Sequence, residues 1–204
     1  MKNFKKIALL ILIMVSMFNC SHDTQIGNED DKFENSQMLR VTSLASDQDF
    51  ILYLNNTNMH LEGIKDIVKA EELLEKGENI SEQEKEELAI AFGYNSYISW
   101  ATYHVDQSRL LKKMDDKYAL TEMPILDLED NIADALGYTT QGSFCEDRYS
   151  NCLAGAMAQA IIAHVGCGWA DLTVAAGILC HGAVYAWHTS MNNDCGYAYH
   201  DCLG

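Results

Sequence analysis

Six cysteines gather in the last third of this 204-residue chain, and they are the residues whose spacing most directly suggests chemistry. Their gaps hold 6, 14, 12, 14 and 6 residues, which is close to a palindrome. Thiols in such number can bind zinc, act as nucleophiles or form disulfides. An even cysteine count in an exported chain is typical of a disulfide framework. We therefore predict disulfides, and no free thiol, at Cys145, Cys152, Cys167, Cys180, Cys195 and Cys202.

Histidines are the other candidate metal ligands. His181 and His188 lie two helical turns apart, and His164 could face them across a hairpin. However, the chain has no C-x-x-C, H-E-x-x-H or H-x-x-x-H spacing, which zinc sites commonly use. Packed or exposed histidines are the better interpretation, so we predict no metal site.

Other catalytic and ligand-binding patterns are weak. The sequence has no G-x-S-x-G elbow, no phosphate-binding P-loop and no G-x-G-x-x-G motif. A cysteine nucleophile beside His181 or His200 would need a free thiolate, which disulfides would remove. We predict no catalytic residue, no cofactor and no enzymatic activity. Tyr94, Tyr97, Trp100 and Tyr103 could form a ligand platform, but their spacing of three is more typical of a packed helix face.

The elements that must position these side chains are predicted to be helices. Ser81 and Glu84 form a capping-box pattern for a helix that stops at Gly93, and Asn95 could cap the next one, which ends near residue 118. A short helix over 127–136 should stop at Gly137. Both stops have the pattern A-[FL]-G-Y, which we interpret as a helix stop rather than a repeat. The segment 50–54, FILYL, fits a helix or a short strand.

The cysteines themselves fall on an Ala/Gly-rich helical hairpin. We expect one helix to begin at Asp147 or Ser150 and run through Val165, and a second to run from about Ala170 to Met191. Small faces allow close backbone approach but bury little area, so crosslinks of ~2–4 kcal/mol each would offset the shortfall. The predicted fold class is mainly α, a helical middle region followed by a disulfide-stapled hairpin.

The predicted pairing of the cysteines follows from helix length. Cys152 and Cys167 are about 22 Å apart on one helix at ~1.5 Å per residue, so they cannot pair. The same reasoning, applied to Cys167 and Cys180 on a second helix unbroken back to the loop, excludes a nested pairing. Cys167, at the loop end, then needs a partner on a flexible tail, and either Cys202 or Cys145 can reach it. The leading prediction is Cys167–Cys202, with Cys152–Cys180 and Cys145–Cys195.

The first twenty residues have the features of an export signal. Lysines precede an apolar run over residues 7–18, which is shorter than the ~20 apolar residues of a membrane-spanning helix. The block Met17-Phe18-Asn19-Cys20 resembles the lipobox of bacterial lipoproteins. That resemblance implies that residues 1–19 are a signal peptide, that Cys20 carries the lipid (palmitate among its acyl chains), and that the protein sits in the cell envelope as an outer-membrane or cell-surface lipoprotein.

Charge and patterning complete the expected organisation. Without its three leader lysines the chain has 11 basic and 30 acidic residues, a formal charge of −19. Such a balance opposes nucleic-acid binding. We predict a lipidated Cys20 with an acidic tether over 20–40, an acidic helical domain over 41–137 and a Cys-rich hairpin module over 138–204.

Two function classes remain at this point. The first is an exported, membrane-anchored lipoprotein that acts as a non-enzymatic binding or structural module, with the lipid bilayer and a protein or receptor as partners. The alternative is a precursor of a C-terminal peptide used in interbacterial antagonism. The hairpin weakly resembles small Cys-rich bacteriocin-type peptides in composition and architecture, and cleavage between Leu136 and Phe144 would favour this alternative.

Overall fold

The computed structural model describes residues 44–138, 143–168 and 174–204. The predicted signal peptide, Cys20 and the tether over 20–40 lie outside these residues. The described residues form seven α-helices and one 3₁₀ turn, with no strand among them. The predicted fold class is therefore confirmed. None of the described helices combines the length and apolarity needed to cross a membrane.

The first described helix, α3 (Gln48–Gly63), includes the segment that could have been a strand. The side chain of Asp47 accepts hydrogen bonds from the backbone amides of Asp49 and Phe50, which fixes the helix start. Asp47 also accepts from the Tyr118 hydroxyl and pairs with Lys117, so the cap ties α3 to the end of α6 (Tyr97–Tyr118).

The middle elements are short: α4 (Ile67–Leu74), the 3₁₀ turn η1 (Gly77–Asn79), α5 (Glu82–Ala91) and α7 (Ile125–Leu136). Two of them, α5 and α7, stop at Gly93 and Gly137 as the sequence predicts. Ser81 and Glu84 form the predicted capping box of α5. The cap of α6 is Ser96 rather than Asn95.

The two A-[FL]-G-Y segments are the same helix stop. Gly93 and Gly137 both have positive φ, 92° and 69°. After each glycine, a tyrosine amide donates to a carbonyl five residues back: Tyr94 to Ala89, and Tyr138 to Ala133. This pattern is the Schellman motif, in which a left-handed glycine lets the chain turn back over the helix end. The helix-stop interpretation is thus confirmed.

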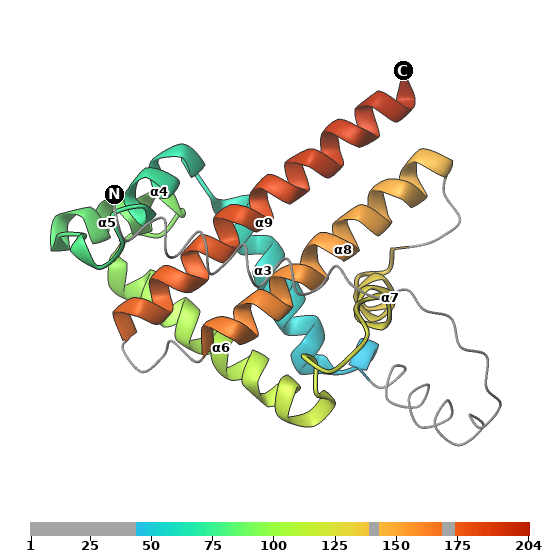
Figure 1. Ribbon diagram of the computed structural model, residues 1–204, viewed down its shortest axis with the longest axis horizontal. Coiled ribbons are helices and arrows are strands. Elements are labelled where there is room, and N and C mark those ends of the chain that lie inside the picture. Colours follow the sequence, from blue (N-terminus) through green and yellow to red (C-terminus); the bar gives the residue numbers. More distant parts are fainter. Residues whose placement is uncertain (1–43, 139–142, 169–173) are drawn as a thin grey trace, which may run out of the picture. The chain divides into compact units, whose positions relative to one another are not determined.

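Two long helices form the hairpin, α8 (Phe144–Cys167) and α9 (Val174–Leu203), and they lie side by side (Figure 1). The first helix begins earlier than predicted, because Ser143 and Glu146 form a capping box. The second, described from Val174 to Leu203, extends beyond its predicted end at Met191. Close packing reaches the middle helices as well: a Cβ at Gly182 would lie 3.2 Å from the Trp100 ring.

The predicted disulfide pairing is wrong. The bridges are nested, Cys145–Cys202, Cys152–Cys195 and Cys167–Cys180, with Cα–Cα distances of 5.8, 5.7 and 5.7 Å. The prediction failed because it measured the axial distance from Cys167 to Cys180 as though one helix carried both. Instead, Cys167 ends α8 and Cys180 lies six residues into the antiparallel α9. The palindromic spacing is the register of this ladder, with steps of seven and fifteen residues on both helices.

Two hydrophobic cores hold the helices together. In the first, Ala154, Met157, Ala158 and Ile161 of α8 pack with residues of α3, α6 and α7. In the second, Ile178 and Tyr185 of α9 pack with α4, α5 and the Trp100 side chain. Both helices of the hairpin therefore pack against the helices that precede them in the chain.

Candidate binding sites

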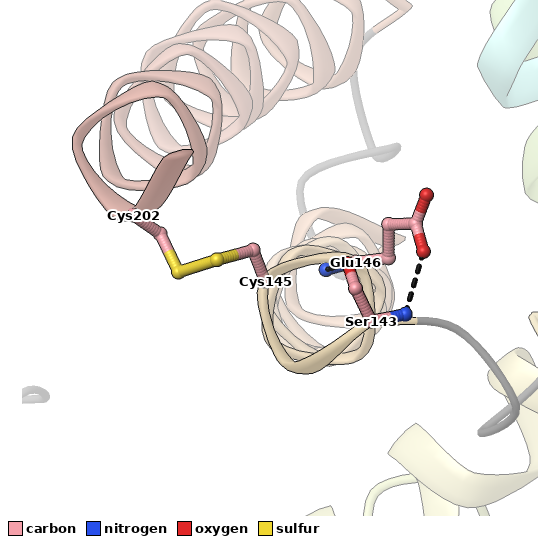
Figure 2. Close-up of a disulfide and its surroundings, with 4 residues drawn as sticks. All are labelled: Ser143, Cys145, Glu146 and Cys202. Atoms are coloured by element: carbon pink, nitrogen blue, oxygen red, sulfur yellow. Dashed lines mark hydrogen bonds between the residues drawn. A yellow bond between two sulfur atoms is a disulfide. The ribbon is translucent and has the colours of Figure 1, made fainter. Parts of the chain in front are cut away.

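The free end of the hairpin, which we name the hairpin tip, comprises residues 143–152 and 195–204. Two of the three disulfides lie in it, Cys145–Cys202 and Cys152–Cys195. Figure 2 shows the outer bridge beside the capping box, in which the Ser143 amide donates to Glu146 at 2.6 Å. Within the tip only Cys195 is buried. The disulfides therefore crosslink a part of the structure that has no hydrophobic core.

The surface of the tip combines aromatic, apolar and acidic groups. Phe144, Tyr197 and Leu203 are exposed, and the rings of Tyr149 and Tyr199 lie 5.0 Å apart across the hairpin. Glu146, Asp147 and Asp201 give the tip three carboxylates, whereas Arg148 is its one Lys or Arg side chain. A helix end with such a surface is suited to contact another molecule, because exposed aromatic groups favour interfaces.

A cluster of buried imidazoles and phenols lies at the junction of α3, α6, α8 and α9. Its ring contacts join His60, His104, His164, His181 and Tyr185 at centroid distances of 4.2–6.1 Å. Burial lowers the pKa of His60 to about 3 and holds the pKa values of His104 and His164 well below 6.5. These imidazoles are therefore neutral at physiological pH.

One contact in this cluster links three helices. The Nδ1 atoms of His164 and His181 lie 2.9 Å apart, and the Nε2 atom of His181 lies 3.0 Å from the Ser108 hydroxyl oxygen. Since a hydrogen bond needs one donor and one acceptor, the two facing nitrogens share a single proton. His104, His164 and His181 also line a cavity of about 510 Å³.

The sequence prediction of the histidines is partly confirmed. His164 and His181 do face each other across the hairpin, as the spacing suggested. His188 is buried two turns beyond His181 on α9, and no hydrogen bond from the described residues reaches either of its ring nitrogens. Among the described residues, no three His, Cys, Asp or Glu side chains are placed to hold a metal ion. His60 and His104 were missed, although their positions on apolar helix faces were a signal for burial.

A second cavity, which we name the aromatic pocket, opens between α3, the turn after α5 and α6. Its volume is about 410 Å³. His60, Phe92, Tyr94 and Tyr103 supply its rings, and Asn56, Asp106 and Gln107 supply its polar side chains. Trp100, by contrast, is fully buried. The predicted aromatic series thus divides: Trp100 belongs to the core, while Tyr94 and Tyr103 line a cavity.

Several hydrogen bonds join the residues that line the aromatic pocket to one another. Tyr94 bonds His60 Nδ1 at 2.9 Å, and Asn56 donates to Gln107 at 3.3 Å. Gln107 in turn donates to the Tyr103 hydroxyl at 3.2 Å. Burial raises the pKa of both phenols, so they stay neutral at physiological pH.

The chain matches no family model, no curated protein and no solved structure.

Proposed function

We propose that the protein is an exported lipoprotein, held to the lipid bilayer through Cys20, whose hairpin tip binds a protein partner without catalysis. The observation that carries this proposal is the position of the two outer disulfides. Crosslinks stabilise small structures that lack a sufficient core, and the tip has none. They fix the spacing of its exposed side chains before any partner arrives, which lowers the entropy lost on binding.

The chemistry of the tip suggests the kind of partner. Its carboxylates outnumber its cationic groups, and the chain as a whole is acidic, with a formal charge of −16. An acidic surface attracts a basic one, and charge complementarity speeds association and suppresses wrong partners. The partner surface should therefore be basic, with apolar recesses for groups such as Phe144 and Tyr197.

The packing of the hairpin favours this function over the antagonism hypothesis. Release of residues 138–204 would expose apolar faces of α3, α6 and α7 that pack on α8, and would uncover Trp100 beside α9. Both cores would lose area that contributes ~25 cal/mol per Å² to stability. The intact mass of the protein from its native envelope distinguishes the two functions. The binding function predicts a single lipidated chain, and the antagonism hypothesis predicts a released fragment of 67 residues.

The binding proposal is tested by site-specific photocrosslinking in native cells. A photoreactive residue at Tyr197, 70 % exposed, should capture a protein partner, whereas one at Val68, 72 % exposed on α4, should not. Replacing Cys145 and Cys202 by Ser should reduce capture at position 197. Equal capture at both positions, or none at 197, would contradict the proposal.

The anchor is tested separately. A Cys20→Ser variant should lose membrane fractionation or fail to mature. Recovery of fully processed Cys20→Ser protein in the membrane fraction, with lipid attached elsewhere, would contradict lipidation at Cys20 and leave the proposal for the tip standing.

A further inference from the structure

The aromatic pocket has a feature that the proposed function does not use: its lining is rich in rings and carries one charge. Asp106 is the only charged side chain that lines it, and neither Lys nor Arg does. Tyr94 and Tyr103 are partly exposed there rather than buried. The faces of aromatic rings are electronegative and attract cations placed within ~6 Å of the ring centre.

The internal hydrogen bonds decide which ligand chemistry fits. Beyond the bonds already described, Gln107 donates to the Tyr53 carbonyl and the Tyr103 hydroxyl lies within hydrogen-bond distance of the Tyr185 hydroxyl. The polar groups of the lining are thus largely engaged with one another. A saccharide, which needs many donors and acceptors, would have to break these bonds, whereas the partly exposed rings of Tyr94 and Tyr103 and the exposed carboxylate of Asp106 remain available.

The one carboxylate is free to exchange its partner. Asp106 pairs with Arg109 at 3.2 Å, and the two side chains are 62 % and 76 % exposed. Ion pairs this exposed contribute little to stability, so an incoming cation can replace the guanidinium at small cost. The acidic surface of the whole chain raises the local concentration of cations around the pocket.

We propose that the aromatic pocket binds a small organic cation of the alkylammonium or quaternary ammonium class. The ammonium group lies against the rings of Tyr94 and Tyr103, and its charge is balanced by Asp106. Two ring contacts and one exposed carboxylate give a dissociation constant on the order of 1 mM. The site is independent of the hairpin tip, which lies at the far end of α8 and α9.

Titration followed by NMR or calorimetry tests the role of charge. Choline is the cationic probe, and 3,3-dimethyl-1-butanol is its uncharged isostere. The mature, oxidised protein should bind choline at least about tenfold more tightly than the alcohol. Glucose is the saccharide probe. Equal binding of choline and the alcohol, tighter binding of glucose, or no choline binding up to about 100 mM would overturn the proposal.

Variants assign the binding to this pocket. Tyr94→Ala should weaken choline binding about tenfold, while Tyr94→Phe, which keeps the ring and loses the hydroxyl, should stay within about threefold. Tyr197→Ala on the hairpin tip is the matched control and should bind as the wild type does. A Tyr94→Ala variant that binds choline normally overturns the assignment.

The carboxylate is tested on the surface, where folding is not at risk. Asp106→Asn should weaken choline binding about threefold to tenfold and reduce its dependence on salt. Asp116→Asn removes an equally exposed carboxylate from the same helix, one paired with Lys112, and should change neither quantity. If the two substitutions have equal effects, the attraction comes from the general surface charge, and the proposed role of Asp106 is overturned.

Discussion

The turn after α5 offers a test of the close approach between α5 and α3. A Cβ atom added at Gly93 would lie 2.1 Å from the Gly63 carbonyl oxygen and 2.9 Å from its carbonyl carbon. Since these are backbone atoms at the end of α3, no side chain can rotate away. Gly137 is the matched control, because it has the same left-handed role in the same motif and nothing lies within 4 Å of its added Cβ.

The two substitutions separate conformational cost from collision. Gly137→Ala should lower the free energy of unfolding by roughly 1–2 kcal/mol, the cost of a left-handed alanine. Gly93→Ala carries a similar cost and must also displace backbone, which adds roughly 1–3 kcal/mol as overpacking does. We expect a total of about 3–4 kcal/mol for Gly93→Ala, or roughly 10 °C in Tm for a domain of this size.

Urea denaturation of the oxidised protein, followed by far-UV circular dichroism, measures both values. The reasoning requires Gly93→Ala to be more destabilising than Gly137→Ala by at least about 1 kcal/mol. If both lose the same stability, the approach of Gly93 to Gly63 contributes nothing, and the packing described for this turn is wrong.

Three further predictions concern acid, the α3 cap and the disulfides. Burial lowers the pKa of His188 from 6.5 to about 4. As pH falls through 6.5, the unfolded chain therefore takes up a proton that the folded chain does not. The contribution of His188 to the free energy of unfolding is complete above pH 6.5 and should fall by up to ~1.4 kcal/mol per pH unit between pH 6.5 and about 4. His188→Phe should therefore lower the acid midpoint seen by circular dichroism, and exposed His200→Phe should not. Asp47→Ala should cost about 1–2 kcal/mol in urea denaturation, with Asp47→Asn closer to wild type because the amide oxygen still caps α3. Replacing both Cys167 and Cys180 by Ser should lower the free energy of unfolding by about 3 kcal/mol. Replacing Cys145 and Cys202 by Ser should leave Tm nearly unchanged, because the freed tip gains similar freedom in the folded and the unfolded chain. If both pairs of substitutions cost the same stability, the tip cannot lack a core.

The parts of the fold that sequence predicts are those fixed by residues close in the chain. The capping box of Ser81 and Glu84 and the glycine stops at Gly93 and Gly137 depend on spacings of a few residues, so they can be identified without tertiary information. The same motif at Ser143 and Glu146 was overlooked because Asp147 and Ser150 offered competing caps. The helix over 50–54 was ambiguous because an apolar run this short fits either period.

The failures concern positions that only tertiary structure determines. The pairing of Cys167 with Cys180 depends on the register of two antiparallel helices, which brings the last residue of α8 level with a residue inside α9. His60 and His104, whose rings are in contact, lie 44 residues apart in the chain, and no local pattern encodes this contact. Tyr94 and Tyr103 have the spacing of a buried face, yet the crossing of α3 with the α5–α6 turn leaves a cavity beside them.

The equal steps of the disulfide ladder determine how the oxidised hairpin can assemble. The innermost cysteines are 13 residues apart, against 43 and 57 for the outer pairs, so their encounter loses the least chain entropy. Once Cys167 and Cys180 are joined, two arms of fifteen residues bring Cys152 and Cys195 level, and two of seven do the same for Cys145 and Cys202. Oxidation can therefore proceed like a zipper from the loop outward, and a helix displaced along its neighbour would leave every remaining thiol without a partner.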